Sequence, residues 1–160
     1  MAILLFRVDD RLIHGQVVLG WGSRLHPTHY LVVDDDLAVS DWEQELYRLS
    51  LAGEAHADFV TVAELLGALS DWTEAAERTV LLTRDLETML RLAEGGALAG
   101  QELNLGGIHH APGRDAVRSY LHLDEADRDR LRRLTALGVT VSGRDLPDSP
   151  RVGLTALLPA

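Results

Sequence analysis

Short apolar runs alternate with longer amphipathic stretches along the whole chain. Most of the runs are continuously apolar, which is the pattern of strands buried on both faces of a sheet. Alternation of such strands with helical stretches is typical of an α/β protein in which helices cover a sheet. The predicted strands are Ala2–Val8, Tyr30–Val33, Phe59–Val62, Thr79–Thr83, Leu103–Leu105, Tyr120–Leu123 and Val139–Ser142.

One amphipathic stretch begins near residue 40. Ser40 and Glu43 have the spacing of a capping box, in which two side chains satisfy the first backbone N–H groups of a helix. Gly53 can end this helix, because glycine readily adopts the left-handed conformation found at helix ends. The apolar residues that share one face of the helix are Trp42, Leu46 and Leu49.

Two further stretches predict helices with clear boundaries. One lies between Asp85 and Gly95, and the other is capped by Asp124 and ended by Gly138. Their apolar stripes consist of Leu86, Met89, Leu90 and Ala93 in the first and Leu131, Leu134 and Leu137 in the second. The segment "GRDLPDSPRVG" is rich in turn-forming residues and predicts a loop. Because no repeat or linker interrupts the pattern, residues 1–160 are predicted to form one domain.

Composition narrows the possible functions. The 15 Lys and Arg residues against 25 Asp and Glu give a formal net charge of -10, which opposes binding to nucleic acid or anionic lipid. Proteins or small molecules are therefore the expected partners. The absence of cysteine excludes disulfides, thiolate nucleophiles and cysteine-ligated metal centres. The start "MAILLFRVDD" lacks a basic leader and a cleavage site, so it predicts neither a signal peptide nor a membrane span.

The strongest candidate for chemistry is the stretch "RVDDRLIHGQVV", directly after the first predicted strand. A helix is expected to begin at Gly15 or Gln16, and its apolar face is formed by Val17, Val18, Trp21 and Leu25. His14 then lies at the carboxyl edge of a buried strand, where open α/β sheets bind their ligands. The start of a helix also favours an anion beside the imidazole ring.

The residue types in this turn suit a histidine that accepts a phosphoryl group. Arg11 offers a planar fork of donors for phosphoryl oxygens, and Gly15 removes a side chain where a close approach matters. A nucleophilic imidazole needs a fixed partner for its other nitrogen, and Asp9, Asp10 or a backbone carbonyl could provide it. An ordinary solvated turn would contain the same residues, so spacing alone does not separate the two interpretations.

Neither His14 nor the other histidines predict a metal site. An arginine next to His14 opposes a divalent cation, and no second ligand stands at metal-binding spacing. His109 and His110 are adjacent, so in an extended loop they point apart, and they are expected to be exposed or to line the site. Surface or strand-end positions are expected for His26, His29, His56 and His122. The glycine-containing segments complete no nucleotide-binding motif, and no cofactor is predicted.

The string "RVDDRLIHGQVV" resembles the active-site signature of a family of bacterial proteins. This is the IIB component of the mannose/fructose/sorbose family of the phosphoenolpyruvate:sugar phosphotransferase system (PTS). Other segments resemble the family in the same order, so that the resemblance covers almost the whole chain; they are "LVVDDDLAVSDW", "TVLLTRDLETMLRLAEGG", "LNLGGIHHAPGR" and "YLHLDEADRDRLRRLTALGVTV".

The resemblance implies a fold, a reaction and a set of partners. The fold is a three-layer α/β/α sandwich with a mostly parallel sheet and an antiparallel edge strand. His14 would take a phosphoryl group from a histidine of a IIA domain or protein and pass it to a sugar held by the membrane components IIC and IID, while Arg11 stabilises the phosphoryl charge. The other residues implied to line the site are Asp10, Gly15, Asp35, Thr83, Gly106 and Gly107. The protein would work in the cytoplasm, attached to the inner face of the membrane through its partners, without a metal or cofactor.

Two other interpretations remain open from the sequence. One is a regulatory protein that keeps the phosphorylatable histidine and signals its phosphorylation state without supplying a sugar permease. The other is a ligand-binding α/β domain with no chemistry at His14. The sugar itself is not indicated, because specificity would belong largely to the membrane components.

Overall fold

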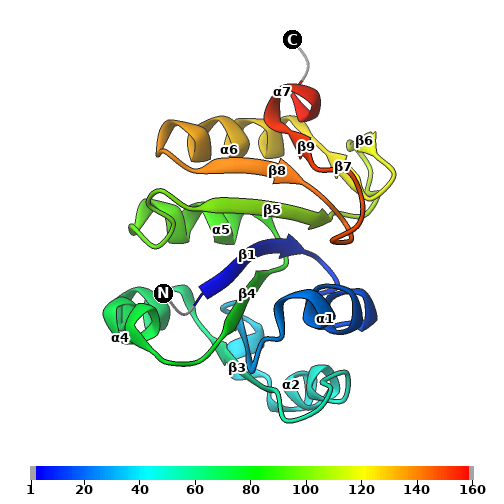
Figure 1. The fold of residues 1–160 in the computed structure, drawn as a ribbon. Helices are drawn as coiled ribbons and strands as arrows, with labels where there is room; N and C mark the ends of the chain where they lie inside the picture. Colours follow the sequence, from blue (N-terminus) through cyan, green and yellow to red (C-terminus); the bar gives the residue numbers. More distant parts are fainter. Residues whose placement is uncertain (1–2, 159–160) are drawn as a thin grey trace.

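A seven-stranded sheet forms the centre of the protein, seen in a computed structural model that describes residues 3–158 (Figure 1). The strand order is β3-β2-β4-β1-β5-β8-β9. All neighbours pair in parallel except β9, which is antiparallel to β8, so the predicted parallel sheet with an antiparallel edge strand is confirmed. The strands are β1 (Ile3–Asp9), β2 (His29–Val33), β3 (His56–Val60), β4 (Thr79–Thr83), β5 (Glu102–Gly107), β8 (Thr140–Gly143) and β9 (Val152–Gly153). The start predicted for the first strand, Ala2, lies outside the described residues.

A separate antiparallel ribbon corrects one expectation. The predicted strand Tyr120–Leu123 exists as β7 (Leu121–Leu123), but it pairs with β6 (Asp115–Arg118). Its link to the main sheet is a single bridge between Ile108 and Leu121. Leu121 and Leu123 are buried while the residue between them is partly exposed, which is the alternation of a ribbon packed through one face. Neither β6 nor β9 was expected, and β9 lies within the predicted loop.

Helices cover both faces of the sheet and complete the three predicted layers (Figure 1). One face is covered by the π-helix η1 (Gln16–Trp21), α1 (Gly22–Leu25), the 3-10 helix η2 (Leu37–Val39) and α2 (Asp41–Arg48). The other core contains side chains of α3 (Val62–Gly67), α4 (Leu69–Glu74), α5 (Leu86–Glu94), α6 (Glu125–Ala136) and α7 (Leu154–Leu157). The helix predicted to begin at Gly15 or Gln16 is confirmed by η1 and α1, and Val17, Val18 and Trp21 are buried.

The two helices with the clearest boundaries form as predicted. Asp85 caps α5 by accepting a hydrogen bond from the backbone N–H of Thr88 at 2.8 Å. Asp124 caps α6, and Asp127 completes a reciprocal capping box there. Gly138 has a φ of 84°, which suits a residue that ends a helix. The expected stripes are buried, apart from Leu137 at the end of α6; they contain Leu86, Met89, Leu90, Ala93, Leu131 and Leu134.

The helix α2 differs from the prediction in its cap, its end and its exposure. The side chain of Ser40 makes no capping hydrogen bond, and the helix ends at Arg48, before Gly53. The apolar side chains of its outer face are 68, 55 and 81 % exposed at Trp42, Leu46 and Leu49. This helix packs near β3, where the sheet ends, and its Tyr47 and Arg48 side chains contact the core.

Arg7 is fully buried in the middle of β1 and joins three parts of the chain. It donates hydrogen bonds to the side chains of Asn104 on β5 (2.6 Å) and Asp9 (3.0 Å). It also donates to the carbonyl oxygens of Arg144 and Asp145, which follow β8. Burial lowers the pKa of Arg7, and the neighbouring Asp9 carboxylate opposes this effect. The charge is therefore held in place by acceptors at both terminal nitrogens of the guanidinium, while the buried Nε has no hydrogen-bond partner among the described residues.

The guanidinium of Arg7 occupies space that only a glycine on β5 leaves open. A Cβ atom at Gly106 would lie 1.9 Å from Cζ of Arg7, far inside van der Waals contact. On its other side, Arg7 lies 5.4 Å from the ring centre of Trp21 in η1. The Arg7 guanidinium is therefore enclosed between Gly106 and Trp21.

Gly106→Ala should lower the free energy of unfolding by about 3 kcal/mol or more, because it displaces a buried, ion-paired arginine. Gly67→Ala is the control: a Cβ at that helical position meets no atom within 4 Å, and the change should shift stability by less than about 1 kcal/mol. Equilibrium urea unfolding measures both. Equal unfolding midpoints in the two variants would contradict the prediction.

Candidate functional site

The turn after β1 lies at the carboxyl edge of the sheet, at the point where the strand order changes direction. β1 lies between β4 and β5; the chain leaves it for β2 on one side and returns to β5 on the other. Ligands of open α/β sheets bind outside the strand ends at such a point. His14 follows β1 in this turn, so its expected position at the sheet edge is confirmed.

Asp9 organises the turn. It is fully buried at the end of β1, and its carboxylate accepts from Arg7 on the interior side. On the outer side it accepts two hydrogen bonds from the guanidinium of Arg11, at 3.0 and 3.1 Å, and one from the Arg11 backbone N–H. These two hydrogen bonds fix the orientation of the guanidinium. The Arg11 side chain remains 31 % exposed and lines a cleft.

His14 is held as a neutral imidazole. Its Nδ1 lies 2.8 Å from the carbonyl oxygen of Leu12, which accepts the N–H of that nitrogen. Leu12 has a φ of 54°, which is uncommon for leucine. Strained backbone of this kind persists where the surrounding packing holds it, and Leu12 is fully buried. Burial is the main cause that lowers the pKa of His14; Arg11 and Arg7 add to it, while the Leu12 carbonyl and Asp9 oppose it. The ring therefore carries a lone pair at neutral pH.

Neither nitrogen of His14 is open to an incoming group in this conformation. The Nδ1 atom is hydrogen-bonded to Leu12, and the Nε2 atom lies 3.7 Å from Oδ2 of Asp9. Nε2 is shielded from solvent and has no hydrogen-bond partner among the described residues. Reaction at His14 therefore requires the ring to rotate outward. In water the ring proton can move between Nδ1 and Nε2. After the rotation, either nitrogen can therefore present its lone pair.

A cleft of about 180 Å³ adjoins the turn. It lies between the turn, the segment that follows β5 and the start of β7; the residues that line it are Arg11, Gln16, Gly107, Ile108, His109, Ser119, Tyr120, His122 and Asp145. The Tyr120 hydroxyl and the Gln16 side-chain oxygen are buried there without a hydrogen-bond partner in the described part of the chain. Burial, with Asp145, raises the pKa of Tyr120, so this hydroxyl keeps its proton and can donate to an anion.

Asp10 and Gly107 determine the shape of the cleft, Asp10 through hydrogen bonds and Gly107 through the space it leaves. The carboxylate of Asp10 accepts from the backbone N–H of His109 at 2.8 Å and contacts Nδ1 of the same residue at 2.5 Å. The loop after β5 is thereby tied to the turn after β1. A Cβ at Gly107 would lie 3.1 Å from both Arg11 Nη2 and Asp9 Oδ1, so a glycine leaves room for their contact. His110 is exposed and makes an edge contact with the imidazole of His122.

The other predicted site residues lie in three different environments. Gly15 is open, because a Cβ there would meet nothing within 4 Å, and this leaves the approach to the turn unobstructed. Gly106 instead makes room for Arg7, as described above. Asp35 accepts from the backbone of Val62 and from Arg91, both at 2.9 Å, and these contacts lower its pKa. It therefore links α3 and α5.

Thr83 is fully buried at the end of β4. Its hydroxyl donates to the carbonyl oxygen of Asp85 at 2.9 Å and so shapes the start of α5. The hydrogen bonds of Thr83 and of Asp35 therefore go to nearby helices. In the described part of the chain, neither residue is hydrogen-bonded to His14 or Arg11.

Sequence reasoning missed several residues of the site. Arg7 stood inside the first predicted strand, and a charged residue within an apolar run was the available signal. Tyr120 and Gln16 gave no such signal, since both reach the cleft through long-range packing. Asp9 was considered only as one of several possible partners for the histidine, but the structure makes it the centre of the contacts.

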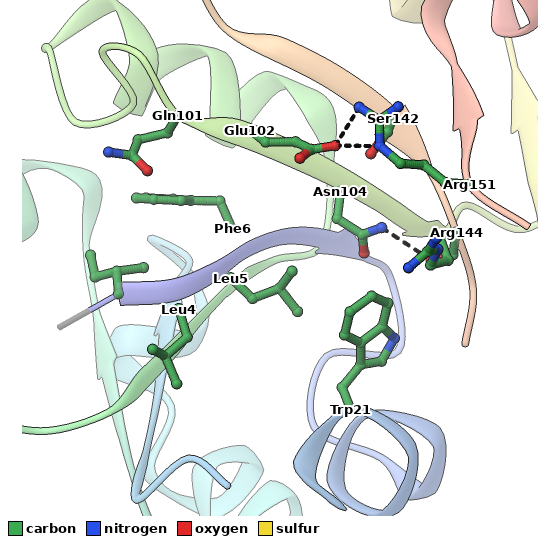
Figure 2. A pocket seen from close by; sticks show the side chains of 11 residues that line it. Leu4, Leu5, Phe6, Trp21, Gln101, Glu102, Asn104, Ser142, Arg144 and Arg151 are labelled. Carbon is green, nitrogen blue, oxygen red and sulfur yellow. Dashed lines mark hydrogen bonds and ion pairs between the residues drawn. The ribbon is translucent and has the colours of Figure 1, made fainter. Parts of the chain in front are cut away.

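A second hollow, of about 230 Å³, is separate from this site (Figure 2). It lies over β1, β5 and β8, with Trp21 at its rim, and none of the predicted site residues lines it. Figure 2 shows Glu102 paired with Arg151, whose closest atoms are 2.6 Å apart. Two of the three charged residues that line the hollow therefore bind one another, and Arg144 is the third. None of the described helices is both long and apolar enough to cross a membrane.

Comparisons with known proteins show the family to which the chain belongs. Residues 3–160 match the family described as the PTS system sorbose subfamily IIB component. The chain is 30 % identical over 158 residues to the mannose-specific EIIAB component of the PTS in Escherichia coli K12. That match covers 99 % of this chain but 49 % of the relative, so the chain spans about half the length of such curated relatives. It is also 30 % identical to the N-acetylgalactosamine-specific phosphotransferase enzyme IIB component 1 of Escherichia coli K12, with 91 % of each protein covered.

Solved structures are similar over nearly the whole length. One is manxB from Thermoanaerobacter tengcongensis, with a TM-score of 0.87 and 31 % identity, covering 97 % of this chain and 93 % of that one. Another is the IIBSor domain of the sorbose permease from Klebsiella pneumoniae, with a TM-score of 0.88 and 25 % identity, covering 98 and 96 %. The fold, the signature turn and the whole-length match agree: this chain belongs to the sorbose subfamily of IIB components of the PTS.

Proposed function

We propose that this protein is a phosphocarrier that accepts a phosphoryl group on His14 from a phosphohistidine of a IIA domain or protein. It then passes the group to a sugar presented by the membrane components IIC and IID. The observation that carries this proposal is a neutral His14 beside an arginine that a buried Asp9 holds in place. Family membership supports the same reaction class.

The transfer needs no proton to move. The lone pair of a His14 nitrogen attacks phosphorus as the bond from phosphorus to the donor nitrogen breaks, and the donor, whose other ring nitrogen carries a proton, leaves as a neutral imidazole. The other nitrogen of His14 keeps its proton throughout. Negative charge is spread over the three phosphoryl oxygens during the step, so positioned donors lower the barrier. The N–H groups of Arg11 and the hydroxyl of Tyr120 supply such donors in the cleft.

The names of the relatives support a IIA donor but no single sugar. The designation EIIAB of the mannose relative joins IIA and IIB, and this chain matches about half of its length. Other relatives are named for N-acetylgalactosamine and sorbose, so the family serves different sugars. We infer that sugar choice belongs to the membrane components, and that the protein works in the cytoplasm at the inner face of the membrane.

The central test is phosphorylation of His14 itself. Incubation with a phosphorylated IIA protein should add one phosphoryl group, detected by intact mass, with a linkage that is labile in acid and stable in alkali. His14→Ala should abolish the labelling, because it removes the nucleophile. His110→Ala removes an exposed imidazole that does not line the cleft and should leave the labelling intact. Undiminished labelling of the His14 variant would refute the proposal.

Arg11→Lys should slow transfer about ten- to a hundredfold, because an ammonium keeps the charge but loses the fork that Asp9 orients. Arg24→Lys is the matched control, since Arg24 forms an exposed pair with Asp148. Rapid-quench measurement of the phosphorylation rate, at equal fold content by circular dichroism, compares the two variants. An unchanged rate in the Arg11 variant would show that this arginine takes no part in transfer.

The phosphorylated protein should not phosphorylate free hexoses at a useful rate, but it should return the group to unphosphorylated IIA. Membranes that contain matching IIC and IID should then open the route to sugar phosphate, which an enzymatic assay of the product measures. Reverse transfer without any effect of the membranes would favour the regulatory interpretation over transport. Rapid formation of sugar phosphate by the isolated protein would contradict both.

A further inference from the structure

A group of possible metal ligands lies at the amino end of the sheet, opposite the edge that holds His14. His29 begins β2 and His56 begins β3, and the parallel register places the two side by side. Asp58 lies two residues further along β3 and therefore points to the same side as His56. We call His29, His56 and Asp58 the His29 cluster. His29 is distant in the sequence from His56 and Asp58, which is why no metal-binding spacing indicated the cluster.

The donor atoms of the His29 cluster are already close to one another. One ligand atom from each of the three residues lies within 4.8 Å of the other two. The Nε2 atom of His29 is 2.8 Å from Oδ2 of Asp58, and the rings of His29 and His56 stack with their centres 4.7 Å apart. Two imidazoles and a carboxylate thus converge on one small volume.

Outer residues hold the two rings in place. Thr79 Oγ1 lies 2.9 Å from Nδ1 of His29, and Trp72 of α4 stacks on the same ring at 5.9 Å between centres. Glu77 is hydrogen-bonded to Nε2 of His56. A hydrogen bond from the second ring nitrogen to a hydroxyl or carboxylate is the usual support of metal-binding histidines.

The burial of the cluster suits a site that is anchored on one side and accessible on the other. The side chain of His29 is 1 % exposed, whereas those of His56 and Asp58 are 50 and 48 % exposed. An ion can therefore reach the cluster from solvent. The two outer ligands can move by about 1 Å onto the fixed ring, as the Zn–N and Zn–O distances of about 2.0–2.2 Å require.

We propose that the His29 cluster binds a zinc ion, with one nitrogen from each of His29 and His56 and a carboxylate oxygen of Asp58 as protein ligands. Nitrogen and oxygen donors in this ratio suit zinc and oppose magnesium or calcium, which prefer oxygen ligands alone. A water molecule completes the tetrahedron on the exposed side. The ion would link β2 to β3 at the edge of the sheet, and the proposal does not depend on the chemistry of His14.

The test is zinc titration of the full chain after treatment with a chelator. Calorimetry should show one zinc equivalent bound, and zinc at a hundredfold excess over its Kd should raise the melting temperature by about 5 °C or more. Magnesium should have no such effect. His56→Ala and Asp58→Asn should each weaken zinc binding at least tenfold, and both positions are exposed enough for the variants to fold. His110→Ala, which removes an exposed imidazole at the other edge, should bind zinc like the parent.

Cobalt provides a second readout that does not depend on stability. The cobalt-loaded protein should show the strong visible absorption of a four-coordinate ion, and His56→Ala should lose it. Unchanged zinc affinity in both cluster variants would overturn the proposal. Loss of binding in His110→Ala alone would also overturn it, because the ion would then be held elsewhere.

Discussion

The shared carboxylate of Asp9 is the interaction on which the rest of the site depends. A fully buried negative charge is costly unless it is paired and hydrogen-bonded. Asp9 meets this requirement with Arg7 on the inner side and Arg11 on the outer side. The inner pair belongs to the core and the outer pair to the cleft. One carboxylate therefore connects the stability of the sheet to the geometry of the reactive turn.

That connection imposes requirements on residues far from His14. Arg7 needs the amide of Asn104 and the space left by Gly106, both on β5. Arg11 needs the absence of a side chain at Gly107, next along the same strand. The segment "NLGG" therefore serves the core and the cleft in successive positions. The loop therefore lines the cleft, and its glycines also contribute by leaving space for the two arginines.

Elements whose identity depends on local pattern could be predicted from the sequence, and those set by distant packing could not. The central strands and α5 and α6 were recognisable from apolar runs and capping residues. The strands β6 and β9 were not, because "DAVR" and "VG" are short and lack an apolar pattern. For α2 the shared apolar face was visible, but no local pattern shows that the sheet ends beside it.

In the site, the turn around His14 is local, whereas Tyr120 enters the cleft from a distant ribbon. The pairing of His29 with His56 depends in the same way on strand register.

The central position of β1 has a consequence for how the protein folds. Along the chain β1 precedes the other strands of the sheet, yet its neighbours are β4 and β5, with Phe6 opposite Leu81 on one side and Leu103 on the other. Contacts of such long sequence separation require large loops to close, and they make folding slow. A nascent chain therefore contains His14 long before it contains a site, since neither the sheet edge nor the glycines of β5 yet exist. The reactive turn acquires its geometry only when β5 has also left the ribosome.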